Sequence, residues 1–472
     1  MKYLYSCLLI LAMILTVSCT EQKDENQTAF EFTAYLDTII QDWEGQDEFI
    51  QEYYKLTGIN LKIVQPPHQQ YMEKLMVSFT ESDSPEVCEV LPEYISLMVS
   101  KEIPLALDEF IESSNYMKDF PDTLLDSLRA RDGKIYGFPT RDGGGCVTYI
   151  RKDWLDNLGL DIPRTWDDFY QVLYAFTHND PDGNGIDDTR GYTDVSSGAE
   201  DWYNRAVMLD ARVEIYYRDG EWVDGFTEDA MIPALERLRK IYQEGLTDSN
   251  IPTNTTFTAR NRFFSGDVGV ITYWGNHWAR NILERTRAVT GPHVEIVAIP
   301  PLEDGYYIKR SAPLLLINRS ADDSQRIFTH FIDRQYDKGE IQSLFTYGVQ
   351  GYHWDYVDGE LRFLTNKNDP YKASFTKAFV PPIAVINDWE QPMPRDEIID
   401  PVLTLLNENS RQQRLKFGEE YFSKYYLEIE RVLKPEIISR IILGELEIEE
   451  GLALYRKRAE ELYLNRILAE LN

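Results

Sequence analysis

Cysteine and histidine are scarce in this chain, with 4 Cys and 6 His in 472 residues. Cys7 and Cys19 lie close to the N-terminus, which leaves Cys88 and Cys146 for the folded part. These two could form one disulfide or remain as separate buried thiols, because free cysteine is a small buried residue type. No pair of histidines has the spacing of a zinc site. The sequence therefore excludes a disulfide framework and predicts no zinc centre.

Positive charge is also in short supply. The chain has 48 Lys and Arg against 79 Asp and Glu, a formal net charge of −31 and a pI near 4.6. No basic patch stands out, so nucleic acids and anionic lipid headgroups would be repelled, and we expect no nucleic-acid partner. The folded part has no internal repeat and no low-complexity segment. Its length exceeds what one hydrophobic core usually serves, and two lobes are expected.

A long apolar run is missing except near the N-terminus. Lys2 is followed by the apolar stretch Leu8 to Leu15, which is too short to span a bilayer and is typical of a secretory signal over residues 1–18. It ends in Thr16-Val17-Ser18-Cys19, which resembles a bacterial lipobox apart from Thr16, where Leu is commoner. That resemblance implies cleavage before Cys19, acylation of Cys19 and a flexible tether over residues 19–29. The alternative is an ordinary signal peptide with an incidental cysteine.

A calcium-binding loop is predicted at residues 180–188. Oxygen-bearing side chains occupy loop positions 1, 3, 5 and 9, and the carbonyl of position 7 adds another oxygen, in the order Asp180, Asp182, Asn184, Ile186 and Asp188. Alternate oxygens folded by a glycine turn, here Gly185, suit a hard cation that needs six to eight ligands. Position 12 is Gly191, so Asp187 or a distant residue would complete the shell. The alternative is a solvated acidic turn.

Strands and helices alternate through the first part of the chain. Residues 30–35, 59–64 and 86–90 read as strands separated by helical segments, which indicates an α/β lobe with a largely parallel sheet. Ligands of such sheets bind beyond the carboxyl ends of the strands. Thr165 and Asp168 form a predicted capping box, and the helix that follows leads into the acidic loop. The cation would therefore have a structural role.

Five stretches resemble blocks of the extracellular solute-binding proteins that feed oligosaccharide ABC importers. They are Gly133–Pro139, Tyr149–Leu160, Pro163–Phe169, Phe263–Val270 and Tyr347–Trp354. The alginate-oligosaccharide-binding branch of that family has a calcium loop in a similar place.

The resemblance implies an α/β, two-lobe periplasmic-binding-protein-like fold (type II), with discontinuous lobes joined by hinge crossings and a ligand cleft between them. We expect residues 30–142 with 308–352 to form the N-terminal lobe. Residues 143–307 with 353–472 would form the C-terminal lobe, which carries the calcium loop.

Trp274 is the leading candidate for ligand contact. It follows the strand-like run Val268–Thr272 and precedes Gly275, at a strand end where such a sheet presents its ligands. A flat aromatic ring can stack on the apolar face of a sugar while polar side chains bond its hydroxyls. Further candidates are Trp202, Trp354, Trp389, Arg141, Asp142, Asp201 and Asn276, with Arg141 important chiefly for an acidic sugar. The alternative for Trp274 is packing in the core near the hinge.

The predicted function is that of a lipid-anchored, extracytoplasmic binding protein. It would bind an oligosaccharide, deliver it to an ABC permease, catalyse no reaction and use Ca²⁺ structurally. We expect a monomer that touches the membrane only through its lipid. Two alternatives are a secreted calcium-binding carbohydrate-active enzyme, whose pair of carboxylates any acidic chain could supply, and a surface carbohydrate-binding protein without transport.

Overall fold

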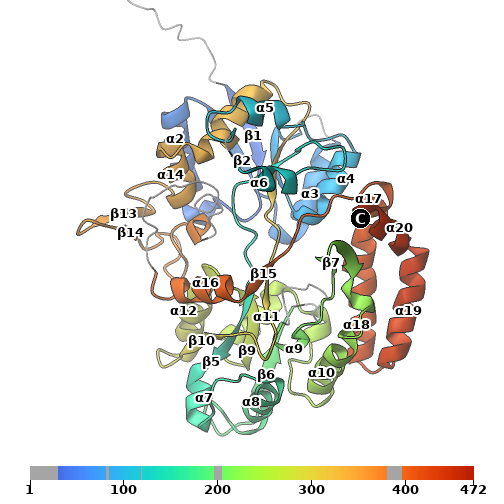
Figure 1. Ribbon diagram of the computed structural model, residues 1–472. Coiled ribbons are helices and arrows are strands. Elements are labelled where there is room, and N and C mark those ends of the chain that lie inside the picture. The colour runs from blue at the N-terminus through green and yellow to red at the C-terminus, as the bar shows by residue number, and fades with distance from the viewer. Residues whose placement is uncertain (1–29, 81–83, 119, 196–204, 380–395) are drawn as a thin grey trace, which may run out of the picture.

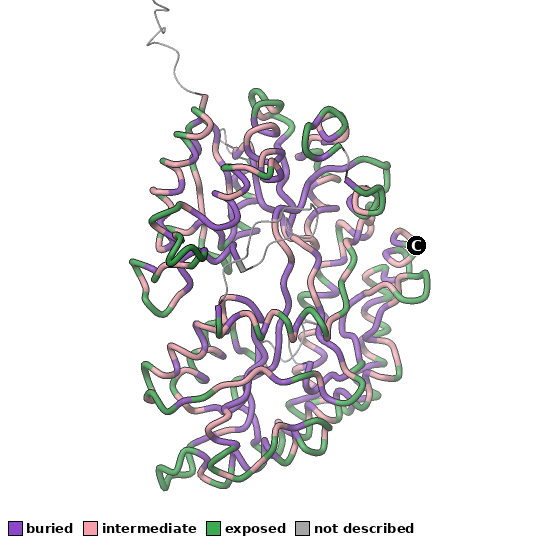
Figure 2. Tube along the Cα trace, turned by 60° about the vertical axis from the view of Figure 1, so that its left-hand side comes forward, coloured by how far each residue is buried: buried purple, intermediate pink, exposed green. Residues whose placement is uncertain are grey.

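The computed structural model describes residues 30–80, 84–118, 120–195, 205–379 and 396–472. Four residues with predicted roles lie outside these ranges: Cys19, Asp201, Trp202 and Trp389. Figure 1 shows two lobes, one above the other, joined by a few segments that run between them. Within the described ranges, no helix is both long and apolar enough to cross a bilayer. Figure 2 shows that buried residues follow the inner strands of both lobes and that exposed residues lie on the outer helices and turns.

The first lobe is built on a five-stranded sheet in the order β2(Asn60–Val64), β1(Glu31–Tyr35), β3(Val87–Val90), β12(Leu314–Ile317) and β4(Phe138–Pro139). β1 pairs in parallel with β2 and β3, whereas β12 runs antiparallel to β3 and β4. The helices α2(Gln46–Thr57) and α3(Tyr71–Ser78) connect the parallel strands, as the alternating pattern predicted. β3 and β12 are buried throughout, because helices cover both faces of the sheet.

The second lobe contains a four-stranded sheet in the order β10(Ile296–Ile299), β5(Cys146–Arg151), β9(Val268–Trp274) and β6(Arg190–Thr193). Every residue of β5 is buried, in keeping with its central place in the sheet. The neighbouring helices include α7(Lys152–Leu158), α8(Trp166–His178), α10(Met231–Gln243), α11(Thr256–Phe264), α12(Trp278–Thr290) and α16(Ile399–Glu408). Cys88 of β3 and Cys146 of β5 are both unpaired and buried.

The predicted capping box of α8 is confirmed. Thr165 Oγ1 accepts a hydrogen bond from the backbone N–H of Asp168 at 3.1 Å, and the Asp168 carboxylate accepts one from the N–H of Thr165 at 3.1 Å. Phe169, Leu173 and Phe176 are fully buried on one face of the helix. The cap fixes where α8 begins, so its other end delivers the chain to the acidic loop at a defined point.

Four C-terminal helices lie along the side of the molecule: α17(Glu420–Glu428), α18(Lys434–Ile442), α19(Ile448–Glu461) and α20(Leu464–Leu471) (Figure 1). α18 packs on α10 of the second lobe, and α17 contacts α4(Ile95–Ser100) of the first. Lys434 is wholly buried, and its ammonium group lies 2.9 Å from Asp224 and 2.7 Å from Glu430. A buried charge needs such partners, and the contact with Asp224, together with a hydrogen bond to the carbonyl of Val213, fixes α18 against the lobe.

Within the described ranges, the hinge includes chain segments that cross between the lobes near residues 140–145, 309–313 and 410–416. β11(Tyr307–Lys309) pairs in parallel with β15(Ser410–Gln412), and Gly145 bridges to Lys309. A Cβ on Gly143 would lie 2.2 Å from the carbonyl oxygen of Arg310, and one on Gly145 would lie 2.5 Å from that of Ile308. Only glycine permits the first two crossings to approach so closely.

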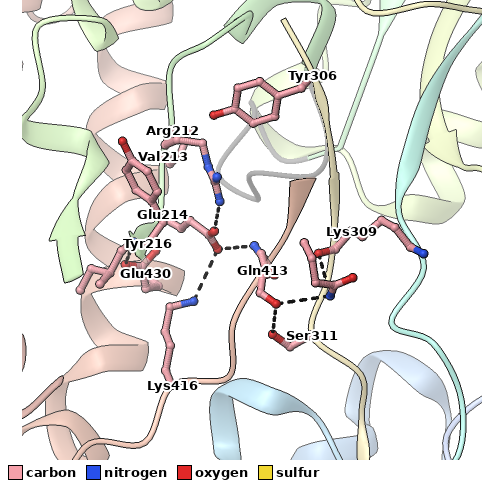
Figure 3. A network of polar contacts seen from close by, with 12 residues as sticks. Arg212, Val213, Glu214, Tyr216, Tyr306, Lys309, Ser311, Gln413, Lys416 and Glu430 are labelled. Carbon is pink, nitrogen blue, oxygen red and sulfur yellow. Dashed lines mark hydrogen bonds and ion pairs between the residues drawn. The ribbon is translucent and has the colours of Figure 1, made fainter. Parts of the chain in front are cut away.

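Polar side chains hold the third crossing in place (Figure 3). The Glu214 carboxylate accepts a hydrogen bond from the amide of Gln413, pairs with Arg212 and lies 3.7 Å from the ammonium of Lys416. Ser311 donates to the carbonyl of Gln413 at 3.2 Å, which links the second crossing to the third. Glu214 and Arg212 are buried, so these contacts are shielded from water and strengthened by the low local dielectric.

Residues 353–379 pack mainly on the first lobe, although the sequence analysis assigned them to the second, and Asp369 also pairs with Arg285 of α12 in the second lobe. Phe375 stacks on Phe49 of α2 with ring centroids 6.2 Å apart. The backbone N–H of Thr376 donates to the buried Glu44 carboxylate at 2.7 Å. The stretch also contains the hairpin of β13(Trp354–Val357) and β14(Glu360–Phe363). The physical reason is the apolar contact of Phe375 with Phe49, together with the hydrogen bond to the buried Glu44.

The close approach of the crossings predicts that Gly143→Ala destabilises the protein. The new methyl group would overlap the Arg310 and Ser311 carbonyl oxygens, at 2.2 and 2.6 Å, and overpacking of this kind costs about 1–3 kcal/mol. Urea denaturation measures the loss. Gly339→Ala is the matched control, because its Cβ would meet only the side chain of Asp337. Equal stability of the two variants would contradict the tight hinge.

Candidate functional site

The ends of the two sheets meet at the hinge and bring four predicted residues together. Trp274 ends β9 and pairs with Cys146, which begins β5. Arg141 and Asp142 follow β4 on the first crossing. Asn276 is buried two residues beyond Trp274, and its side-chain oxygen accepts the N–H of Trp278 at 3.1 Å. The junction between the lobes is therefore lined by residues that the sequence selected.

Trp274 is only half-buried, unlike the strand residues before it. Its ring lies against Gly144, where a Cβ would be 3.4 Å from the ring, and the guanidinium carbon of Arg310 lies 5.6 Å from a ring centroid. Gly144 has a φ of +67°, so it satisfies both the turn of the first crossing and the contact with the indole. The indole of Trp274 therefore packs against the hinge at Gly144, and part of its surface remains accessible.

Arg141 and Asp142 each have a partner of opposite charge. Arg141 donates to the buried Glu89 carboxylate through Nε at 2.7 Å, and Asp142 lies 2.6 Å from the ammonium of Lys309. Burial raises the pKa of Glu89, while the positive charge of Arg141 lowers it. Burial lowers the pKa of Lys377 to about 7, although the negative charge of Glu89 opposes the shift. Charged groups at the junction are thus partly desolvated, which strengthens their electrostatics.

Trp354 does not join this group. It lies in β13 with 8% of its surface exposed, donates its indole N–H to the carbonyl of Gly348 at 2.9 Å and packs edge-on against Tyr347. Its contacts are those of a packing residue in the first lobe. Asp201, Trp202 and Trp389 lie outside the described residues.

Five residues at the junction were missed by the sequence analysis, and we call them the junction cluster: Trp43, Arg260, His277, Trp278 and Lys372. The ammonium of Lys372 lies 3.7 Å from the Trp43 ring centroid. The guanidinium carbon of Arg260 lies 4.3 Å from that of Trp278. Trp43 follows the end of the first strand, which could have singled it out. Arg260 and Lys372 belong to an ordinary helix and an irregular segment, and no local pattern marks them.

The backbone of the acidic loop folds as a cation-binding loop would, but within the described residues its side chains do not stand in metal-binding geometry. Gly183 and Gly185 adopt φ of +70° and +78° and fold the loop back on itself. Asn184 Nδ2 donates to Asp182 at 2.9 Å and lies 3.4 Å from Asp188, and the Asp180 carboxylate accepts the N–H of Gly185 at 3.0 Å. Desolvation raises the pKa of Asp182, and the charges of Asp188 and Asp180 add to the rise.

These contacts test whether calcium fits. Side-chain oxygens of Asp180, Asp182 and Asp188 converge on Asn184, and crowded carboxylates favour either a proton or a cation between them. The side chain of Ile186 has no polar atom, so only its carbonyl oxygen could be a ligand. In the described part of the chain, no three His, Cys, Asp or Glu side chains already stand in metal-binding geometry. The donor set suits calcium, but the carboxylate side chains would have to rotate toward a common point to bind it.

A separate cavity of about 680 Å³ lies between α4 and α17. Leu97, Val99 and Phe417 line it, and its edge carries an ion pair of 3.5 Å between Arg131 and Glu419. In Figure 1 these helices lie on the side of the hinge that carries the C-terminal helices. Because its walls come from both lobes, the cavity changes shape whenever the angle between them changes.

Two proteins of Bacillus subtilis are similar in sequence to this chain. Lipoprotein LipO of Bacillus subtilis is 28% identical over 334 residues, which are 66% of this chain and 65% of LipO. The polygalacturonan/rhamnogalacturonan-binding protein YtcQ of the same organism is 28% identical over 356 residues, 69% of this chain and 67% of YtcQ. The match therefore spans about two thirds of the length of these relatives.

The fold is shared with a solved structure, the alginate-binding protein AlgQ2 without calcium ion. It superposes with a TM-score of 0.71 at 17% identity and covers 94% of this chain and 97% of AlgQ2. The predicted α/β, two-lobe periplasmic-binding-protein-like fold is thereby confirmed. The profile of the family described as bacterial extracellular solute-binding protein matches residues 44–326, more than half of the chain. This chain therefore belongs to the bacterial extracellular solute-binding proteins, the family that its sequence blocks resembled.

Proposed function

We propose that this protein captures an oligosaccharide between its two lobes and delivers it to an ABC permease. The observation that carries the proposal is the half-buried Trp274, which rests on the hinge glycine Gly144 among polar residues of both lobes. A sugar ring stacked on this indole would touch both lobes at once. YtcQ and AlgQ2 are named for the polysaccharides that they bind, which agrees with a saccharide ligand.

Binding at the hinge explains how capture would be signalled to a permease. The lobes are connected by narrow crossings, so a ligand that contacts both of them favours one angle over others by its differential affinity. A permease that recognises this angle would accept only the loaded protein. Genes for two permease subunits beside the gene for this protein would be consistent with that role.

The charges near Trp274 favour binding over hydrolysis. A glycosidase needs two carboxylates free to act as acid and base or nucleophile. Asp142, on the first crossing, pairs with Lys309, and Glu89, which contacts that crossing, pairs with Arg141. We therefore place this protein among the binding proteins and not among the carbohydrate-active enzymes.

Calcium would stabilise the second lobe through Asp180, Asp182, Asn184, the carbonyl of Ile186 and Asp188. The ion would neutralise the crowded carboxylates and fix the chain between α8 and β6, and all of the chemistry that it supplies is structural. The loop lies between α8 and β6, and the first residue of β6, Arg190, pairs with Val268 at the start of β9, so the loop is at the opposite end of that strand from Trp274. Its removal would therefore lower stability more than saccharide affinity.

Lipidation of Cys19 would hold the protein at the outer face of a bacterial membrane. Residues 19–29 would tether the folded lobes to the lipid, which would be the only membrane contact of a monomer. The name of the relative LipO as a lipoprotein agrees with this anchor. More than one acyl chain would be required, because a single chain binds membranes only marginally.

A panel of neutral and acidic oligosaccharides titrated in a calorimeter tests the proposed function. We expect at least one to bind and to be recovered intact by chromatography after incubation. Trp274→Ala should weaken that binding by about 1–3 kcal/mol, the scale of a lost aromatic anchor. Trp222→Ala removes a half-buried tryptophan of the β7(Ile215–Arg218)–β8(Glu221–Asp224) hairpin and is the matched control. Cleavage of the ligand, or binding by no saccharide, would refute the proposal.

Chelation should lower the melting temperature of the wild type, because calcium binds the folded state alone. At one hundred times its dissociation constant the ion stabilises by about 2.7 kcal/mol. Asp182→Ala should respond little to chelator, whereas Asp161→Ala, which removes an exposed carboxylate outside the loop, should respond fully. Equal responses of all three proteins would place the metal elsewhere.

Cys19→Ser should release the protein from membranes into the soluble fraction, because it removes the acylated sulfur. Fractionation of cells followed by detection of the protein measures the change, and mass spectrometry of the wild-type N-terminus should show the added acyl mass. Cys88→Ser, which changes a buried thiol of β3, is the control and should remain in the membrane fraction. Membrane retention of Cys19→Ser would argue against the anchor.

A further inference from the structure

Two tryptophans at the junction each hold a cation over the indole ring. Lys372 lies over Trp43 and Arg260 over Trp278, at 3.7 and 4.3 Å from the ring centroids. Asn368, on the same segment as Lys372, donates to the carbonyl of Trp43 at 3.0 Å, which ties this pair to the first lobe. Arg260 and Trp278 belong to α11 and α12 of the second lobe. The two cations therefore stand on opposite sides of the junction.

The two pairs lie near one another, because the cations of both act electrostatically on the ring of His277. Burial, together with the positive charges of Lys372, Arg141 and Arg260, lowers the pKa of His277 to about 3. Three cations from both lobes therefore act on one imidazole. The Nδ1 atom of His277 is buried and has no hydrogen-bond partner among the described residues. An orphaned polar atom of this kind points to a group that the chain itself does not provide.

Among the described residues, Arg260 and Lys372 have fewer carboxylates beside them than are needed to neutralise their charges. In the described ranges Arg260 makes no ion pair, and its guanidinium donates to the hydroxyl of Tyr273 at 2.9 Å. The Asp369 carboxylate lies 3.9 Å from Lys372 and is already bound by Arg285.

The nearest buried carboxylates add little compensation. Glu89 is paired with Arg141, and Glu44 accepts hydrogen bonds from the backbone N–H and the hydroxyl of Thr376, so in the described ranges neither carboxylate is bonded to Lys372 or Arg260. This local positive excess stands in a chain with a net charge of −31, so the general composition does not explain it. Partly desolvated like charges repel, and an anion placed between them would relieve that cost.

From this arrangement we infer that the junction cluster is a subsite for the carboxylate of an acidic saccharide. Lys372 from the first lobe and Arg260 from the second bind the acid group of a uronate residue, while His277 Nδ1 accepts a hydrogen bond from a neighbouring hydroxyl. The inference rests on the proposed function and narrows its ligand to oligosaccharides that contain uronic acids.

The chemistry of the two cations suits a carboxylate. Arg260 is kept flat on an indole, so its planar guanidinium is pre-oriented and loses little freedom when it binds a planar acid group. Lys372 supplies a point charge from the other side. Because the carboxylate contacts both lobes, the acid group itself contributes to holding them together, and neutral sugars lack this contribution.

Calorimetry with matched ligands tests the subsite. Trigalacturonate and trimannuronate are compared with their methyl esters, which keep the rings and remove the charge. Wild type should bind one of the acids at least about tenfold more tightly than its ester, since a lost charge-assisted contact costs that much or more. Arg260→Gln and Lys372→Gln should weaken the acid about tenfold and leave the ester unchanged. The preference of wild type for the acid should also decline with added salt.

Lys367→Gln is the matched control, because Lys367 also lies over an aromatic ring, that of Tyr352 at 3.9 Å, but is exposed. It should bind both ligands as wild type does, and melting temperatures confirm that each variant is folded. Equal affinity for acid and ester, or equal losses for both ligands in the variants, would overturn the subsite. Neutral oligosaccharides that bind through Trp274 would then still support the proposed function, whereas the failure of every saccharide to bind would refute both.

Discussion

The close approach of two backbone segments at the hinge is the constraint on which the rest of the structure depends. Gly143 and Gly145 bring the first crossing against the carbonyl oxygens of residues 308, 310 and 311, at distances that no side chain tolerates. The crossings are therefore narrow, and the sheets that they connect end close to the same place. Gly144 lies beneath the ring of Trp274. One glycine run thus fixes both the joint between the lobes and the floor of the candidate site.

Ion pairs connect the lobes on both sides of this joint. Arg285 of α12 pairs with Asp369, whose segment packs on the first lobe, and Arg131 pairs with Glu419 beside the cavity. These side chains are about one fifth to three fifths exposed. Exposed pairs of this kind contribute about 0–1 kcal/mol each. These two pairs therefore add little to the connection that the glycine crossings make between the lobes.

Much of the local structure could be predicted from the sequence because it depends on neighbouring residues. The capping box of Thr165 and Asp168 and the glycine turn of the acidic loop are examples, since each is decided within a few positions. Trp274 and Arg141 could be placed near the hinge from the sequence, because strand ends and crossings are visible in the pattern; their role in ligand binding stays a prediction. The return of residues 353–379 to the first lobe was not, because it depends on distant contacts such as Phe375 on Phe49. Trp43, Arg260 and Lys372 meet only through tertiary folding, and no spacing rule links them.

The strand order of the first sheet has a consequence for how the chain folds. β3 is buried along its whole length, yet one of its edges is covered by β12, whose residues come more than two hundred positions later. All four strands of the second sheet lie between residues 146 and 299, so each finds its strand partners within that range. When folding starts from the N-terminal part of the chain, β3 therefore presents an open apolar edge until residues 314–317 pair with it. Such an edge is a template for intermolecular pairing, and its closure depends on a contact of long sequence separation, which forms slowly.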